Sequence, residues 1–148
     1  MSSYAHPRLS LGGVPIHAMF DPFPIACFTG ALLTDFAYYK TATIQWANFS
    51  AWLLAFGLIM GAFSALFGLI DLFRLRRQDR PLIGWIHAGG SIIVLLLALL
   101  NSFVHARDGW TSVVPTGLTL SAITVLVLIV TGFLGHRMAY VPSYGERS

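Results

Sequence analysis

Long apolar stretches separated by short polar ones dominate the chain. Four of them are long enough to cross a lipid bilayer, which takes about 20 helical residues. They cover approximately residues 22–39, 47–73, 82–104 and 113–138. Each must be a helix, because lipid offers no hydrogen-bond partner to exposed backbone N–H and C=O groups. The pattern therefore predicts an all-α fold, a four-transmembrane-helix bundle, with residues 1–148 forming a single membrane domain.

The starts of the helices carry local signals. Asp21 followed by Pro22 is typical of an N-cap residue and the first helical position, where a missing N–H costs little. We therefore expect the first helix to begin at Pro22, capped by Asp21. Pro81 and Pro115 are expected to open the third and fourth helices in the same way.

Composition agrees with a membrane location and indicates an orientation. Only 10% of the residues are charged, against about 25% in soluble domains. Seven of the nine basic residues lie near the termini or in the arginine-rich segment 74–80, whereas Lys40 and Arg107 lie on the other side. The positive-inside rule then places both termini in the cytoplasm of a bacterium, with the chain in its inner (plasma) membrane. This charge distribution predicts no nucleic-acid partner.

The second apolar stretch carries small residues on one face and an acid at its end. Gly57, Gly61, Ser64 and Gly68 are spaced so that they project in similar directions, and Asp71 follows on the same line. Small residues at this spacing let helices approach closely in lipid. Asp71 either pairs with Arg74 or Arg77 one turn onward or accepts a hydrogen bond that orients a histidine.

The third stretch places two histidines on one face at opposite membrane boundaries. His87 and His105 are eighteen residues apart, which is five helical turns. Asn101 lies on or near the same line. Each histidine is either a hydrogen-bonded structural residue or a functional one, since ionisable groups at membrane depth justify a functional hypothesis.

Three histidines are expected at one membrane depth, near the cytoplasmic boundary. His17, His87 and His136 gather there with Asp71 and form the candidate cofactor site. Two histidines on facing helices can bind a b-type haem, and His87 with His136 is the simplest pair for the haem iron; a quinone is the other candidate. Alternatively, the clustering is accidental, because polar residues belong at boundaries. The opposite boundary holds His105 without a second histidine, which disfavours a two-haem architecture.

Asp35 lies late in the first helix and has two interpretations. It pairs with Lys40 or Arg107, or it acts as a proton-carrying or quinone-contacting acid. Together with Asp71, His105 and Asn101 it forms the predicted second shell or proton relay. No nucleophile–base, phosphate-loop or zinc signature is found, so the sequence predicts no catalytic residues.

Several short motifs occur in an order that resembles a known bacterial family. They are Ile16-His-Ala-Met-Phe-Asp-Pro-Phe-Pro-Ile25, Asp35, Gly68-Leu-Ile-Asp71, the His87-Ala-Gly-Gly stretch and the ending Gly132-Phe-Leu-Gly-His-Arg-Met-Ala-Tyr140. The chain resembles the membrane family called domain of unknown function 2231, although alanine replaces its usual proline after His17. The resemblance implies a four-helix membrane domain found beside redox modules such as cytochromes c and dehydrogenase-like proteins.

Three functions are compatible with this picture. The first is a redox-linked membrane partner that binds a b-type haem or quinone and serves a periplasmic dehydrogenase or cytochrome. The second is a non-catalytic anchor or assembly subunit of a larger complex, because short loops leave no room for a soluble catalytic domain and the glycine-rich faces suit association, including a homo-oligomer. The third is a proton-coupled transporter, which is weaker because the sequence shows no inverted repeat.

Overall fold

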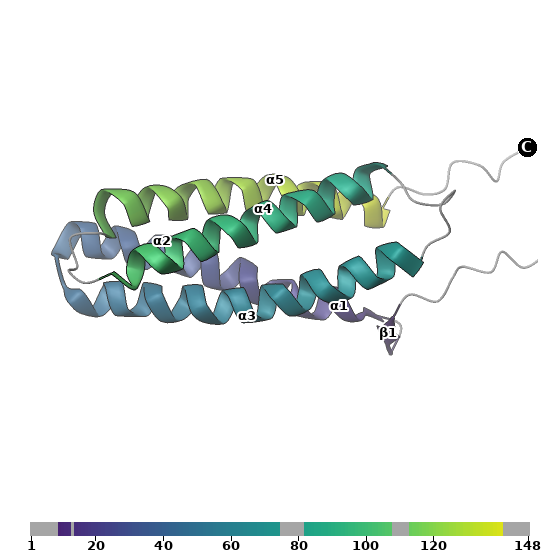
Figure 1. Cartoon of the computed structure of the whole chain (residues 1–148), viewed down its shortest axis with the longest axis horizontal. Helices are drawn as coiled ribbons and strands as arrows, with labels where there is room; N and C mark the ends of the chain where they lie inside the picture. Colours follow the sequence, from purple (N-terminus) through teal and green to yellow (C-terminus); the bar gives the residue numbers. More distant parts are fainter. Residues whose placement is uncertain (1–8, 13, 75–81, 108–112, 141–148) are drawn as a thin grey trace, which may run out of the picture.

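The computed structural model describes residues 9–12, 14–74, 82–107 and 113–140, and their side chains except those of residues 83 and 136–140. Four long helices lie along the length of the molecule (Figure 1): α2 (Pro22–Thr41), α3 (Ile44–Arg74), α4 (Leu82–His105) and α5 (Leu118–Tyr140). The described part also contains the antiparallel strands β1 (Ser10–Leu11) and β2 (Val14–Pro15), the short helix α1 (Ile16–Phe20) and the π-type turn η2 (Val113–Gly117).

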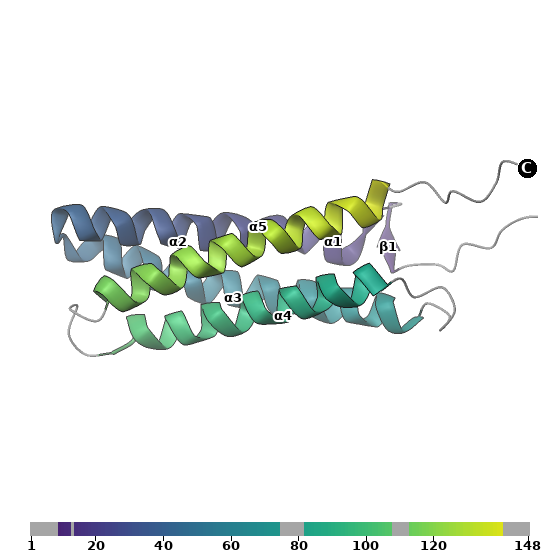
Figure 2. The same cartoon turned by 90° about the horizontal axis from the view of Figure 1, so that it is seen from above.

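The four long helices form a bundle in which each contacts two neighbours. Helix α2 packs against α3 and α5, and α4 packs against the same two helices. The turned view in Figure 2 shows the same lengthwise arrangement. Strand β1, helix α1 and the last turn of α5 lie at one end, which we call the terminal end (Figure 1). The other end, which we call the distal end, holds the two-residue connection Ala42–Thr43.

The predicted number of membrane-spanning helices is confirmed within the described residues. Four segments are long and apolar enough to cross a membrane: Ile16–Thr41, Ile44–Arg74, Gly84–His105 and Val113–Gly135. The small strand pair at the start was not predicted. It involves four residues, too few for a detectable period-two pattern.

Helix α2 begins at Pro22, with Asp21 at its N-cap position, as predicted, but the Asp21 side chain does not cap the helix. Helix α1 already begins at Ile16, and Asp21 itself has helical dihedral angles, with φ −52° and ψ −39° and no capping hydrogen bond from its side chain. Its carboxylate accepts instead from the Ser64 hydroxyl of α3. An N-cap residue must be non-helical to reach back to the first amides. Pro22 does occupy the first turn of α2, as expected.

The fourth helix is less regular at its start than predicted. Val114 is extended, with φ −122° and ψ 126°, and the regular α-helix begins only at Leu118. The cause is Pro115, because a proline disfavours the helical conformation in the residue before it. Pro81, expected to open the third helix, lies outside the described residues.

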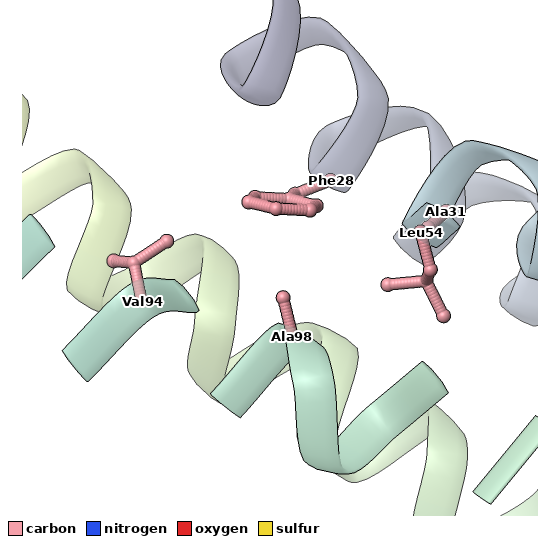
Figure 3. Close-up of a cluster of buried hydrophobic side chains, with 5 residues drawn as sticks. All are labelled: Phe28, Ala31, Leu54, Val94 and Ala98. Atoms are coloured by element: carbon pink, nitrogen blue, oxygen red, sulfur yellow. The ribbon is translucent and has the colours of Figure 1, made fainter. Parts of the chain in front are cut away.

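The interior is built from small and apolar side chains. Its buried core consists of Phe28 and Ala31 of α2, Leu54 of α3, and Val94 and Ala98 of α4. In Figure 3, Phe28 of α2 faces the two α4 residues across the interior. A Cβ added at Gly57 would lie 2.6 Å from Cε1 of Phe28. The predicted packing role of the small-residue face of α3 is thus confirmed at Gly57, where only a hydrogen atom fits.

Candidate functional site

Near the distal end, four polar side chains from three helices form a closed network. Asp35 of α2 has an exposed fraction of 0%, and the His105 side chain of α4 has 1%. Nε2 of His105 lies 2.8 Å from Oδ1 of Asp35. Ser121 of α5 donates its hydroxyl to Oδ2 of the same carboxylate at 2.6 Å, and Nδ2 of Asn101 donates to the Ser121 oxygen at 2.7 Å. We call these four residues the distal cluster.

The hydrogen bonds of the distal cluster fix the form of its histidine. Nδ1 of His105 lies 2.9 Å from the carbonyl oxygen of Asn101. A carbonyl oxygen can only accept, so Nδ1 must carry a proton. Nε2 and Oδ1 of Asp35 then share one further proton. Both carboxylate oxygens of Asp35 are thus engaged, Oδ1 by His105 and Oδ2 by the Ser121 hydroxyl.

One atom of the distal cluster has no partner. Oδ1 of Asn101 is buried and makes no hydrogen bond among the described residues. Turning the amide over does not help, because the Ser121 hydroxyl already gives its proton to Asp35 and therefore needs a donor from Asn101. An unpaired buried acceptor costs about 1–3 kcal/mol.

At the terminal end, Asp71 of α3 binds the start of the chain. Oδ2 of Asp71 lies 3.1 Å from Nδ1 of His17, and Oδ1 accepts the backbone N–H of Leu9 at 2.9 Å. The Ser64 hydroxyl, two turns before Asp71 on α3, lies 3.2 Å from the carbonyl oxygen of His17. The ring of His17 also lies over Gly68, with Cγ 3.8 Å from where a Cβ would be. The Asp71 carboxylate thus joins α3 to the start of the chain, which is distant in sequence.

A second histidine at this end belongs to the other helix pair. Nδ1 of His87 on α4 lies 2.9 Å from the carbonyl oxygen of Thr131 on α5. Its ring packs on the backbone of Gly135, where a Cβ would lie 2.7 Å from Cε1 and 3.5 Å from Nε2. Gly90 is equally tight, since a Cβ there would lie 2.6 Å from Oγ1 of Thr131. The α4–α5 contact is therefore close at this level.

The two terminal-end histidines share one chemical feature. Each has Nδ1 facing an acceptor, the Asp71 carboxylate for His17 and the Thr131 carbonyl for His87. An Nδ1–H held in this way leaves Nε2 as the nitrogen that can accept a proton, donate one or bind a metal. No hydrogen bond to either Nε2 is found among the described residues. The His17 side chain is 28% exposed, so a ligand can reach it.

A haem held between His87 and His136 stays a prediction. The ring of His87 packs against Gly135, where a Cβ would lie 2.7 Å from Cε1. His136 follows Gly135 in α5, but its side chain lies outside the described part. Among the described residues, no group of three or more His, Cys, Asp or Glu side chains could hold a metal ion.

The structure bears on three sequence expectations about pairing. Asp71 meets His17, the histidine-orienting alternative, and Arg77 of the other alternative lies outside the described residues. Asp35 pairs with His105, not with Lys40 or Arg107; Lys40 instead lies over the rings of Phe36 and Tyr39. His17 and His87, expected together, belong to separate clusters with different hydrogen-bond partners.

Sequence reasoning missed several of the residues that complete these clusters. Ser64 was assigned to packing, and the α5 residues Ser121 and Thr131 were not singled out. A signal existed, since Ser121, Thr124 and Thr131 are polar, buried and spaced to project from one face of an otherwise apolar helix. Polar positions at helical spacing within a membrane helix indicate the face turned to the protein interior.

Comparison with known proteins gives one match. The family model described as "Predicted membrane protein (DUF2231)" matches residues 13–146, which is nearly the whole chain. No curated protein and no solved structure matched.

Proposed function

Since the chain belongs to the DUF2231 family of predicted membrane proteins, we propose that it is a redox-linked membrane protein that binds a quinone or quinol at the terminal end, where His17 exchanges a proton with the ligand. The single observation that carries the proposal is the His17–Asp71 pair, with Nδ1 and Oδ2 3.1 Å apart and the histidine more exposed than the carboxylate, 28% against 8%. In this geometry the Asp71 carboxylate holds Nδ1 of His17, and Nε2 of the same ring can act as a general base.

The pair suits the chemistry of a quinol. Asp71 holds the Nδ1–H and stabilises the imidazolium, so Nε2 of His17 can accept the proton of a quinol hydroxyl. In the reverse direction, the imidazolium donates Nε2–H to a quinone carbonyl oxygen. Quinone oxidation and reduction move protons together with electrons, so a base of this kind at membrane depth has a definite role.

Aromatic side chains beside His17 support a flat ligand. Phe20, one turn after His17 in α1, stacks on Phe67 of α3 with ring centroids 5.8 Å apart. Phe63 lies 5.8 Å from Phe20 in the same way and is 46% exposed. An apolar ring face next to a single polar anchor is the usual composition of a small-molecule site. A quinone ring fits it, with its tail in the lipid.

The quinone itself carries the electrons, and this chain exchanges only the protons. The electrons come from a periplasmic dehydrogenase, which reduces the quinone, or pass to a cytochrome, which oxidises the quinol; either partner is met through quinone diffusing in the bilayer. A quinone is preferred to a b-type haem because the partly exposed His17–Asp71 pair supports proton exchange, whereas the His87 ring packs closely against Gly135.

Quinone binding tests the proposal directly. Purified protein in detergent is titrated with a short-chain ubiquinone analogue, and tryptophan fluorescence is followed. Saturable quenching is expected, and His17→Ala should weaken binding at least about tenfold, equivalent to 1.4 kcal/mol. Asp71→Asn should weaken it too. Asp35→Asn, which alters an acid at the distal end, is the matched control and should bind normally. Equal affinity in the wild type and His17→Ala would refute the assignment, as would a haem absorption band in place of quinone binding.

A second candidate, a non-catalytic anchor or assembly subunit, is favoured by one observation. Gly89 of α4 and Gly132 of α5 have nothing within 4 Å of where a Cβ would be. Small residues at open helix positions let a helix of another chain approach closely. The test is size-exclusion chromatography and co-purification from membranes: Gly132→Leu should release a bound partner or second copy. A wild-type protein that emerges as a lone monomer contradicts this role.

A further inference from the structure

The strands β1 and β2, which together we call the N-terminal ribbon, have one apolar face. Their register pairs Leu11 with Val14, and Ser10 with Pro15. Successive residues of a strand point to opposite faces, so Leu11 and Val14 share one face of the ribbon. Leu11 is 68% exposed and Val14 is 48% exposed. The described part of the chain therefore leaves this apolar face largely uncovered.

The lengths of the helices give the depth of the terminal end in a membrane. The hydrocarbon core of a bilayer takes about 20 helical residues. Counted from Trp46, which is exposed near the start of α3, this length ends at Leu66. Counted back from Lys40, which is exposed near the end of α2, it ends at Phe20. The two levels agree, because the ring of Phe20 stacks on Phe67, and they place the hydrocarbon boundary of the terminal end there.

The N-terminal ribbon is held just outside this boundary. Asp71 follows Leu66 by a little more than one helical turn, about 8 Å along the axis, which is the depth of the headgroup layer. The backbone N–H of Leu9 donates to Oδ1 of Asp71 at 2.9 Å, and that of Ile16 donates to the carbonyl oxygen of Leu9 at 2.8 Å. Both ends of the ribbon are thus fixed beside Asp71. Figure 1 shows β1 at the lower edge of the bundle, alongside the last turns of α3 and not beyond them.

We propose that the N-terminal ribbon is a membrane-interface anchor, whose Leu11–Val14 face inserts between the lipid headgroups and the upper acyl chains beside α1. The partner is the lipid bilayer itself. Interfacial elements bury their apolar face about 5–10 Å into this zone, and two strand residues at about 3.3 Å each cover that distance. The anchor keeps the segment that carries His17 at the bilayer surface. This role goes beyond quinone binding and does not depend on it.

The surroundings of the ribbon favour lipid over a protein partner. Met19 of α1 and Phe23 of α2 are each 45% exposed, so exposed apolar side chains continue from the ribbon into the first membrane-spanning segment. A stable protein–protein interface buries about 1,200–2,000 Å² in total, far more than two side chains of so short a ribbon offer. Two apolar side chains do suffice for a shallow contact with lipid, because each gains by leaving water.

Spin labels on single cysteines test the proposal. The full chain, in a Cys27→Ala background, is placed in lipid nanodiscs with a nitroxide attached at Leu11→Cys, Val14→Cys or Ser10→Cys. Power saturation compares contact with oxygen, which concentrates in lipid, and with a nickel chelate, which stays in water. The oxygen-to-nickel ratio at Leu11→Cys and Val14→Cys should exceed that at Ser10→Cys at least about threefold, because only one face of the ribbon enters the interface. Leu33→Cys, at a position of α2 that is 65% exposed within the first span, calibrates the lipid reading.

A charge on either face of the ribbon separates insertion from mere proximity to lipid. Leu11→Asp should remove the preference for oxygen of the label at Val14→Cys, because a carboxylate resists transfer out of water. The matched change Ser10→Asp, on the opposite face, should leave that preference unchanged. The proposal is overturned if the labels at Leu11→Cys and Val14→Cys favour nickel, if both faces give the same ratio, or if Leu11→Asp has no effect. Labels that contact neither reagent would also overturn it, since they would indicate a protein or a second copy on this face.

Discussion

Single residues in this protein act through their partners, and the partners come from distant parts of the chain. Asp35 and His105 are seventy positions apart, and Asp71 and His17 fifty-four. In each case a carboxylate on one long helix fixes the ring of a histidine on another element. Two such pairs at opposite ends of an apolar bundle give it two polar sites that differ in exposure: the distal pair is sealed, and His17 of the terminal pair is not.

The sealed pair should show strong coupling between its members. Asp35→Leu leaves a buried histidine without its counter-charge, and His105→Leu leaves a buried carboxylate without its donor. Each should lower the free energy of unfolding by about 3–5 kcal/mol, whereas the double variant should cost less than either alone. Unfolding by SDS in mixed micelles, followed by circular dichroism, gives the three values. Losses that simply add would show that the two side chains do not act as a pair.

Depth in the membrane was predictable from sequence, but pairing was not. Hydropathy placed Asp35 and His105 at one boundary and Asp71 with His17 at the other. Which acid meets which base depends on the rotation of each helix about its axis, and this is set by packing at positions such as Gly57 and Gly135. A short helix before Pro22, too brief to show a period, brought His17 onto Asp71.

At the scale of the element, helix α3 packs closely against α2 because Gly57 has no side chain. Gly57→Ala would place a methyl group 2.6 Å from the Phe28 ring and 2.9 Å from Cβ of Cys27, and Phe28 is itself only 1% exposed. Overpacking of this kind should cost about 1–3 kcal/mol. The matched change Gly89→Ala meets nothing and should be neutral or stabilising by up to about 1 kcal/mol. Thermal unfolding in detergent compares them; equal midpoints would mean that the α2–α3 contact is looser than described.

The segment formed by β1, β2 and α1 is held to the bundle by few polar contacts. Leu9 and His17 both bind Asp71, and Ser64 contacts the His17 carbonyl. Asp71→Ala removes two hydrogen bonds to a charged group, each worth about 1.5–3 kcal/mol. Amide hydrogen exchange over residues 9–20 should then accelerate at least about tenfold, as read by mass spectrometry. Asp35→Asn should leave this exchange unchanged, and an equal acceleration there would point to global loosening instead.

At the scale of the whole molecule, the chain passes along the bundle four times, so the two ends of the described chain lie at the same end of the bundle, the terminal end. The number and approximate bounds of the helices followed from hydropathy alone, because a bilayer demands helices of a minimum length. The irregular start of the last helix did not follow from hydropathy, because it depends on Pro115. The N-terminal strands did not follow from it either, because they depend on tertiary contacts with Asp71.

Orientation in the membrane can be tested with single cysteines. In a Cys27→Ala background, Ser10→Cys marks the terminal end and Thr43→Cys the distal end. If the arginine-rich side is cytoplasmic, a membrane-impermeant maleimide should label Thr43→Cys in intact spheroplasts and Ser10→Cys only in inverted vesicles. The opposite labelling would reverse the orientation and place His17 on the periplasmic side.

The backbone N–H of Leu9 donates to the same carboxylate that orients His17. One carboxylate therefore holds both the first described residue of the chain and the ring of His17. A bulky purification tag at the N-terminus that strains the Leu9 hydrogen bond disturbs the carboxylate that orients the histidine, without touching the histidine itself. Affinity handles and fluorescent reporters are better attached after Tyr140, which lies at the same end but on a helix that makes no described hydrogen bond to Asp71.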